Sequence, residues 1–164
     1  MGKSPIAGRV TAAAEGDVVV FLIGMRINRW CSARHWIPVF GAMRRMLAEL
    51  DRDPSAGLLG YRLLTAGPRE YMVLQYWESR EKLLAYAADG GRAHRPAWAA
   101  FNRRARQAAG RVGIWHETYV VPEGSYESVY SGMPRHGLGA AHGVEPVARR
   151  GERAAERLGI PAGS

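Results

Sequence analysis

His116 is the residue of this sequence best suited to move a proton. It lies in the run 112–121, which predicts a β-strand whose alternate residues face opposite sides. A histidine on a buried strand needs a hydrogen-bond partner or a chemical task. Two interpretations stay open: a structural histidine satisfied in the core, or a proton donor and acceptor in a pocket between sheet and helices. Glu117 has the same ambiguity, as an ion-paired acid or a pocket carboxylate.

A second histidine, His94, precedes the helix expected to start at Pro96. It can be an exposed loop side chain. The chemical alternative is an axial haem ligand, because a neutral imidazole binds iron well. The sequence holds no Cys-x-x-Cys-His attachment motif and no evident second ligand, so nothing else in it supports haem.

Aromatic residues recur near these histidines. Their usual place is the core, but the five tryptophans of the chain could also line a cavity for a planar ligand. The aromatic residues that we single out are three of these tryptophans, together with a tyrosine and a phenylalanine: Trp77, Trp98, Trp115, Tyr76 and Phe101.

The chain has a formal net charge of +8 at pH 7, from 23 Lys and Arg against 15 Asp and Glu. Only two of the basic residues are lysines, so we interpret the excess mainly as the coding bias of a GC-rich genome. Six arginines between Gly90 and His116 have no acid among them, which fits a solvated helix face or a phosphate contact. No helix-turn-helix, zinc-finger or RNP-type motif is present, so nucleic acid is not an expected partner. The six are Arg92, Arg95, Arg103, Arg104, Arg106 and Arg111.

Several protein classes are excluded. The sequence has no P-loop, no Gly-x-Ser-x-Gly and no His-Glu-x-x-His motif, and Cys31 alone can form neither a disulfide framework nor a cysteine-rich zinc site. The longest apolar run, Val18–Ile23, has six residues against the roughly 20 of a membrane span, so we expect no membrane partner. The first residues carry no apolar signal segment, so we expect a cytoplasmic protein.

The elements that must position these residues follow the order strand, helix, strand, strand, helix, strand. Apolar spacing predicts a helix over 36–50, and a Gly-Pro turn at 65–69 makes a hairpin of its flanking strands. This order is the ferredoxin-like βαββαβ plan, an α+β fold with a four-stranded antiparallel sheet. We expect a flexible arm over 1–16, the domain over 17–121, and a covering loop with a short helix over 122–164.

The first strand is apolar on both faces, with Val19 and Phe21 alternating with Val20 and Leu22. Helices on one side of the sheet would leave the other face in water, which soluble monomers rarely tolerate. We therefore expect a homodimer that buries this face between two sheets.

Four segments together resemble one family: Phe21–Asn28, Val73–Trp77, His94–Asn102 and Gly113–Tyr119, with Tyr126–Tyr130 and Met133–Pro134 continuing the match. The chain resembles the small monooxygenase-like family whose fungal relatives act in fumagillin biosynthesis, within the dimeric α/β-barrel superfamily of antibiotic-biosynthesis monooxygenases. The resemblance covers about residues 17–140.

The resemblance implies a dimer that oxygenates an activated carbon of an enolisable or aromatic secondary metabolite, with no metal or flavin. For that chemistry we assign His116 as base, with Asn28 and Trp77 as catalytic hydrogen-bond donors. Two alternatives remain: a haem enzyme of the same superfamily, aldoxime-dehydratase-like or haem-degrading-like, with His94 on the iron, and a dimeric ligand-binding domain without catalysis. The candidate substrate-binding residues are Arg26, Tyr76, Trp98, Trp115 and Tyr119.

Overall fold

The computed structural model describes residues 4–88 and 96–160, with only the backbone described over 96–101. Among the described residues no helix is both long enough and apolar enough to cross a membrane.

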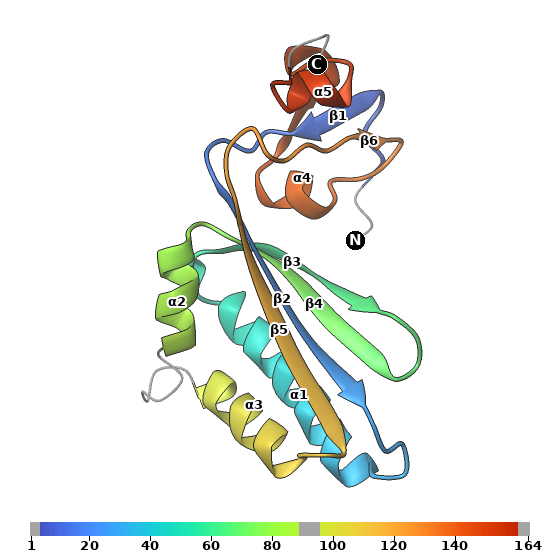
Figure 1. Cartoon of the computed structure of the whole chain (residues 1–164), viewed down its shortest axis with the longest axis vertical. Helices are drawn as coiled ribbons and strands as arrows, with labels where there is room; N and C mark the ends of the chain where they lie inside the picture. Colours follow the sequence, from blue (N-terminus) through green and yellow to red (C-terminus); the bar gives the residue numbers. More distant parts are fainter. Residues whose placement is uncertain (1–3, 89–95, 161–164) are drawn as a thin grey trace.

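The main sheet has four antiparallel strands in the order β3-β4-β2-β5 (Figure 1). Consecutive strands β3 and β4 form the predicted hairpin, and the central strand β2 pairs along its length with β5. The strands are β2 (Val18–Ile27), β3 (Leu58–Thr65), β4 (Glu70–Trp77) and β5 (Val112–Val121), and the helices are α1 (Ala33–Leu50), α2 (Arg80–Ala88) and α3 (Pro96–Gln107). The ferredoxin-like plan predicted from the sequence is confirmed.

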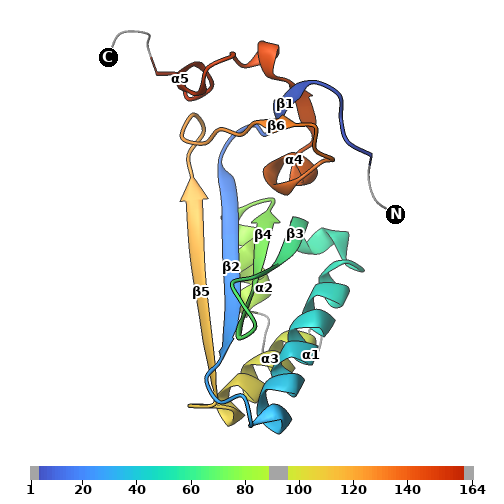
Figure 2. The ribbon, with the colours of Figure 1, turned by 90° about the vertical axis from the view of Figure 1, so that its right-hand side faces the viewer.

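The helices α1 and α3 cover one face of this sheet, which we call the helix-covered face (Figure 2). Odd-numbered residues of β2 and β4 enter the core there, because strand residues alternate between faces. They meet the apolar side of α1, whose buried residues recur at helical spacing. Core members include Phe21, Ile23, Val39, Met43, Met46, Leu47, Val73 and Trp77.

The opposite face, here the open face, carries even-numbered residues of β2 and β4 and lies away from α1 and α3 (Figure 2). The short helix α4 (Gly137–Ala141) covers one end of it, at Gly60 and Tyr76. Leu22 and Leu74 are half-buried in the single chain, as expected for the apolar face that the helices leave open. Val20 is half-buried too, and it packs against the cluster that contains Leu138. The indole of Trp115 on β5 lies over Gly24 of β2 and shields part of this apolar surface.

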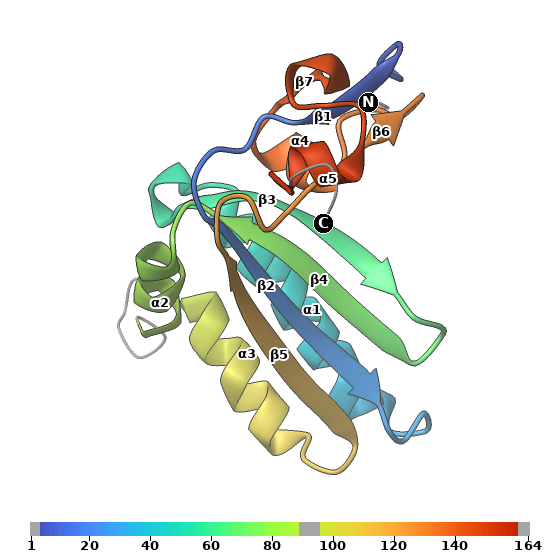
Figure 3. The same cartoon turned by 45° about the horizontal axis from the view of Figure 1, so that its top comes forward.

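A second, small sheet is built from both ends of the chain, in the order β6-β1-β7 (Figure 3). The central strand is β1 (Arg9–Ala12), so the flexible arm expected over 1–16 is wrong for this stretch. Its partners in β6 are about 120 residues away in sequence and those in β7 more than 130 residues away, so no local sequence pattern predicts this pairing. The other elements here are β6 (Tyr130–Ser131), α4 (Gly137–Ala141), β7 (Val144–Pro146) and α5 (Ala154–Arg157), and short 3₁₀ turns lie at η1 (Pro54–Ala56) and η3 (Val147–Arg149).

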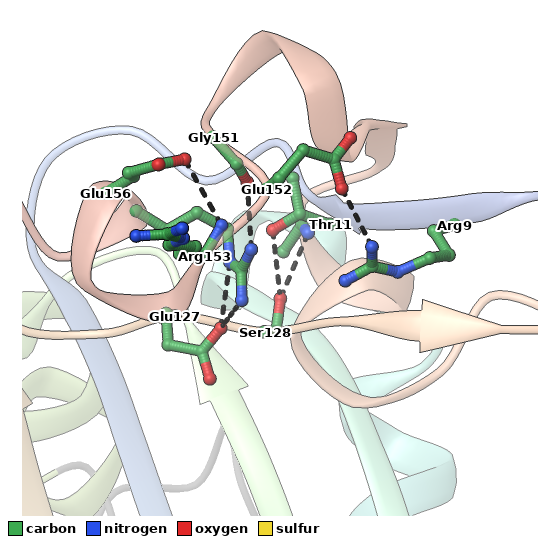
Figure 4. Close-up of polar contacts among 10 residues, drawn as sticks. Arg9, Thr11, Glu127, Ser128, Gly151, Glu152, Arg153 and Glu156 are labelled. Atoms are coloured by element: carbon green, nitrogen blue, oxygen red, sulfur yellow. Dashed lines mark hydrogen bonds and ion pairs between the residues drawn. The ribbon is translucent and has the colours of Figure 1, made fainter.

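We call residues 122–160 the C-terminal module. Polar contacts hold it together and join it to β1 (Figure 4). The Oγ of Ser128 accepts from the backbone N–H of Ala12 at 3.0 Å. Arg9 of β1 donates to Glu152 at 2.8 Å. Within the module, Arg157 donates from Nε and Nη2 to one oxygen of Glu127, at 3.0 and 2.9 Å. An apolar cluster that includes Val18 and Leu138 joins the module to the end of the main sheet.

Candidate functional site

The structure separates the predicted site residues onto two faces of the sheet. His116 pairs with Ile23 and Trp77 pairs with Val19, which places both on the helix-covered face. The predicted substrate-binding residues lie on the other side: Arg26, Tyr76, Trp115 and Tyr119 are all on the open face. A single pocket within one chain therefore cannot be lined by the whole predicted set.

The ring of His116 is exposed in the single chain and lies 5.9 Å from the ring of Phe21, centroid to centroid. Thr118 and Val120 follow it on the same face of β5, at the two-residue period of a strand. This part of the helix-covered face is uncovered by described side chains, since both of these residues are exposed as well.

His116, Thr118 and Val120 form an exposed strip along β5. A cavity of about 460 Å³ lies at the Val120 end of this strip. It forms where β2 begins, β5 ends and α2 begins. Val19 and Val120 supply its apolar wall, and the remaining lining residues are polar: Glu15, Asp17, Glu78, Ser79, Arg80 and Glu81. Val120 is two same-face positions beyond His116, so the cavity and the histidine share one side of β5.

The rim of this cavity is negatively charged. The pKa of Glu81 is lowered, first by a hydrogen bond from its own backbone N–H and then by the guanidinium of Arg80, 3.0 Å away. The acids are not arranged as a metal site, because no group of three or more potential metal ligands occurs among the described residues. An anionic rim of this kind favours neutral or cationic ligands over anionic ones.

Trp77 is 1% exposed, and its indole N–H is already used inside the core. Its Nε1 donates to Oε1 of Gln75 at 2.9 Å, and its ring lies 5.4 Å from that of Tyr86. The Nε2 of Gln75 is buried without a hydrogen-bond partner among the described residues. Gln75 was not singled out in the sequence, although a polar residue at a core position of the alternation Tyr71, Val73, Gln75, Trp77 was the available signal.

Asn28 follows the end of β2 and is exposed, and its Oδ1 accepts from Nη1 of Arg26 at 3.2 Å. Tyr119 donates from its hydroxyl to Glu117 at 2.8 Å, and this hydrogen bond is the main reason why the pKa of Tyr119 is raised. These polar pairs sit near opposite ends of the open face, away from His116.

Tyr76 belongs to a polar cluster that sequence spacing could not reveal. His136 precedes α4, and its Nε2 accepts from Nη1 of Arg62 on β3. Burial, followed by the charge of Arg62, lowers the pKa of His136. Burial, followed by the nearby Tyr130, raises the pKa of Tyr76. The cluster ties the C-terminal module to the open face.

Two predicted residues cannot be placed. His94 lies outside the described residues, and so does the side chain of Trp98. The haem alternative, which depends on His94, stays a prediction.

The four-stranded antiparallel sheet with helices on one face defines a ferredoxin-like α+β protein. Residues 18–138 match the family described as monooxygenase af470-like, and the chain belongs to that family.

The chain is 27% identical over 142 residues to monooxygenase af470 of Aspergillus fumigatus. The match covers 79% of this chain and 47% of that relative, so the chain spans about half the relative's length. Among solved structures it is similar to SnoaB, a cofactor-independent oxygenase from Streptomyces nogalater, at 15% identity and a TM-score of 0.43, over 63% of this chain and 91% of that one. It is also similar to a putative antibiotic biosynthesis monooxygenase from Nitrosomonas europaea, at 11% identity and a TM-score of 0.42, over 66% and 92% of the two chains.

Proposed function

We propose that this protein is a small, cofactor-independent monooxygenase that oxygenates an enolisable or aromatic secondary metabolite on the helix-covered face of its sheet. Membership of a monooxygenase-like family supports the reaction class. One observation carries the assignment of the site: the exposed ring of His116, beside Phe21, lies on the strip of β5 that leads to the 460 Å³ cavity.

In this reaction His116 accepts a proton from a substrate CH₂ group that a neighbouring carbonyl or aromatic ring acidifies. The carbanion gives its electrons to dioxygen, and a C–O bond forms to make a hydroperoxide. Loss of the second C–H proton then breaks the O–O bond. One oxygen atom ends in the product carbonyl and the other in water, so the substrate supplies every electron that dioxygen accepts.

The apolar wall that Val19 and Val120 give the cavity suits the flat face of a planar substrate. The anionic rim near Glu81 suits a neutral substrate better than a charged acid. This geometry gives less support to Trp77 and Asn28 as catalytic hydrogen-bond donors. The indole N–H of Trp77 already donates to Gln75, and Asn28 lies on the opposite side of the sheet from His116.

The test is dioxygen consumption with an anthrone, a tricyclic compound with one activated CH₂ group. We expect uptake by the wild-type chain and a loss of about a hundredfold in His116→Gln, which keeps a polar side chain but removes the base. His142→Gln in the C-terminal module is the matched control and should consume oxygen as the wild type does.

Circular dichroism shows whether each variant is folded. Equal uptake by His116→Gln and wild type would remove the base assignment. No uptake with any activated CH₂ compound would favour the ligand-binding alternative, and a Soret absorbance band in the purified protein would favour haem.

We further propose that the protein is a homodimer whose two open faces pack together, because Leu22 and Leu74 are only half-buried in one chain. Light scattering should give twice the mass of one chain. Leu74→Glu should give the mass of one chain, since a charge would be buried in the interface. A wild-type monomer would contradict the proposal.

A further inference from the structure

One end of the molecule presents apolar side chains to solvent. This end, which we call the arginine tip, is formed by the segment between β2 and α1, the first turns of α1, and the connection from α3 to β5; it lies at the bottom of Figure 1. Trp30 is 46% exposed there and Ile37 is 54% exposed. The Trp30 ring stacks on Trp36 at 5.5 Å and 23°, and Nε1 of Trp36 donates to the Trp30 carbonyl at 3.2 Å. The exposed indole is therefore held in a fixed position.

Arginines lie in the same segments as these apolar side chains and in the segments packed against them. The backbone N–H of Arg29 donates to the carbonyl of Arg111 at 3.2 Å, which brings two distant segments together. Arg34 and Arg104 line a hollow of about 170 Å³ between α1 and α3, together with His35. The four arginines thus come from three parts of the chain and meet at one end of the fold.

Acidic residues are scarce at this end. Segments 28–48 and 96–116 contain no Asp or Glu. Glu70 is the register partner of Arg26 near the end of β2, and Arg69 precedes it in the sequence. In the described part of the chain, Arg29, Arg34, Arg104 and Arg111 form no ion pair. The tip therefore keeps an uncompensated positive charge.

The hollow also contains an unsatisfied polar atom. The Nδ1 of His35 is buried and has no hydrogen-bond partner among the described residues. His35 lines the hollow together with Arg34 and Arg104, and the charges of Arg111 and Arg34 are near enough to add to the effect of burial in lowering the pKa of His35. Two cationic donors and a ring nitrogen around one small hollow suit a phosphate oxygen better than an apolar group.

We propose that the arginine tip docks onto an anionic membrane surface. Trp30 and Ile37 enter the boundary between lipid headgroups and acyl chains, and the arginines contact headgroup phosphates. Tryptophan is the side chain typical of that depth, because its ring is apolar and its N–H stays hydrated. A lipid surface fits these residues better than a nucleic acid does, since Trp30 already stacks on Trp36 and Ile37 offers no face for a base.

Such a contact is peripheral and needs no spanning helix. The absence of a long apolar run led to the expectation of no membrane partner, but the tip is assembled from short segments that meet only in the fold. The inference goes beyond the proposed oxygenation and does not depend on it. Vesicle binding and oxygen consumption are separate measurements that can fail separately.

The test is co-sedimentation of the full chain with vesicles. We expect binding to vesicles that contain phosphatidylglycerol, little binding to pure phosphatidylcholine, and weaker binding as salt rises. Trp30→Ser combined with Ile37→Ser should weaken binding by on the order of tenfold or more. Arg34→Gln and Arg111→Gln should each weaken it about fivefold.

Two variants outside the tip serve as matched controls. Leu63→Ser changes a 52% exposed leucine of β3, and Arg149→Gln changes an exposed arginine of the C-terminal module. Both should bind as the wild type does, and circular dichroism should show that all variants are folded. The proposal is overturned if phosphatidylglycerol vesicles are not bound, if tip and control variants lose binding equally, or if the tip arginines instead govern binding to a single-stranded oligonucleotide.

Discussion

The indole of Trp115 lies so close to Gly24, its register partner across β2 and β5, that any Cβ at residue 24 would overlap the ring. Because Gly24 has no side chain, it leaves the space on β2 that the indole of Trp115 on β5 occupies. The pair is also the clearest feature of the open face, because Trp115 points away from the helices whereas the adjacent His116 points toward them.

Gly24→Ala should therefore displace the indole and lower the free energy of unfolding by about 1–3 kcal/mol, the usual cost of overpacking. Urea denaturation measures the change. Gly113→Ala is the matched control on the neighbouring strand, because its Cβ would meet Asn28 at an ordinary distance of 3.6 Å. Equal losses in both variants would mean that the contact with Trp115 is not the cause.

The hydrogen bond between Trp77 and Gln75 should show as coupling in a double-mutant cycle. Gln75→Met leaves the indole N–H unpaired in the core and should cost about 1–3 kcal/mol. Trp77→Phe leaves the Gln75 amide without its one partner and adds a loss of packing. The double variant should cost less than the two single costs together, because neither polar group remains. Strict additivity in urea unfolding would argue against the bond.

Protonation of His136 should destabilise the protein below neutral pH. Its pKa in the folded state is lowered from 6.5 by burial and by Arg62, so between the two pKa values only the unfolded state binds the proton. The free energy of unfolding should be highest above about pH 6.5 and should fall as the pH drops through that value toward the folded-state pKa.

His136→Gln should flatten this part of the pH profile, and Arg62→Met should raise the pKa of His136 in an NMR titration, since the guanidinium no longer opposes the proton. An unchanged pH slope in His136→Gln would assign the effect to other groups.

The ion pair of Arg157 with Glu127 should matter more than a pair at the surface. The Arg157 side chain is 6% exposed, so Glu127→Gln leaves a largely buried charge without its carboxylate and should cost the C-terminal module about 1–3 kcal/mol. Hydrogen exchange at the amides of α5 reports this local loss. The matched control is Glu152→Gln, whose partner Arg9 is half exposed and whose pair is worth about 0–1 kcal/mol. Equal exchange rates in the two variants would contradict the expectation.

The main sheet could be predicted from the sequence because its signals are local. Alternation over β2 and β5, helical spacing in α1 and the turn between β3 and β4 each act within a few residues. The candidate site was harder to predict. Alternation does place His116 and Trp115 on opposite faces, yet residue chemistry alone grouped both into one pocket.

The sequence by itself determined the strand and helix order, the facing of each strand residue and the family, because periodicity and motif are properties of neighbouring residues. Tertiary structure alone decided that β1 joins both ends of the chain, that His136 accepts from Arg62 across 74 residues, and that Arg111 lies beside Arg29, the residue before Trp30. These contacts depend on how elements far apart in the sequence pack against one another, and no local sequence pattern encodes that packing.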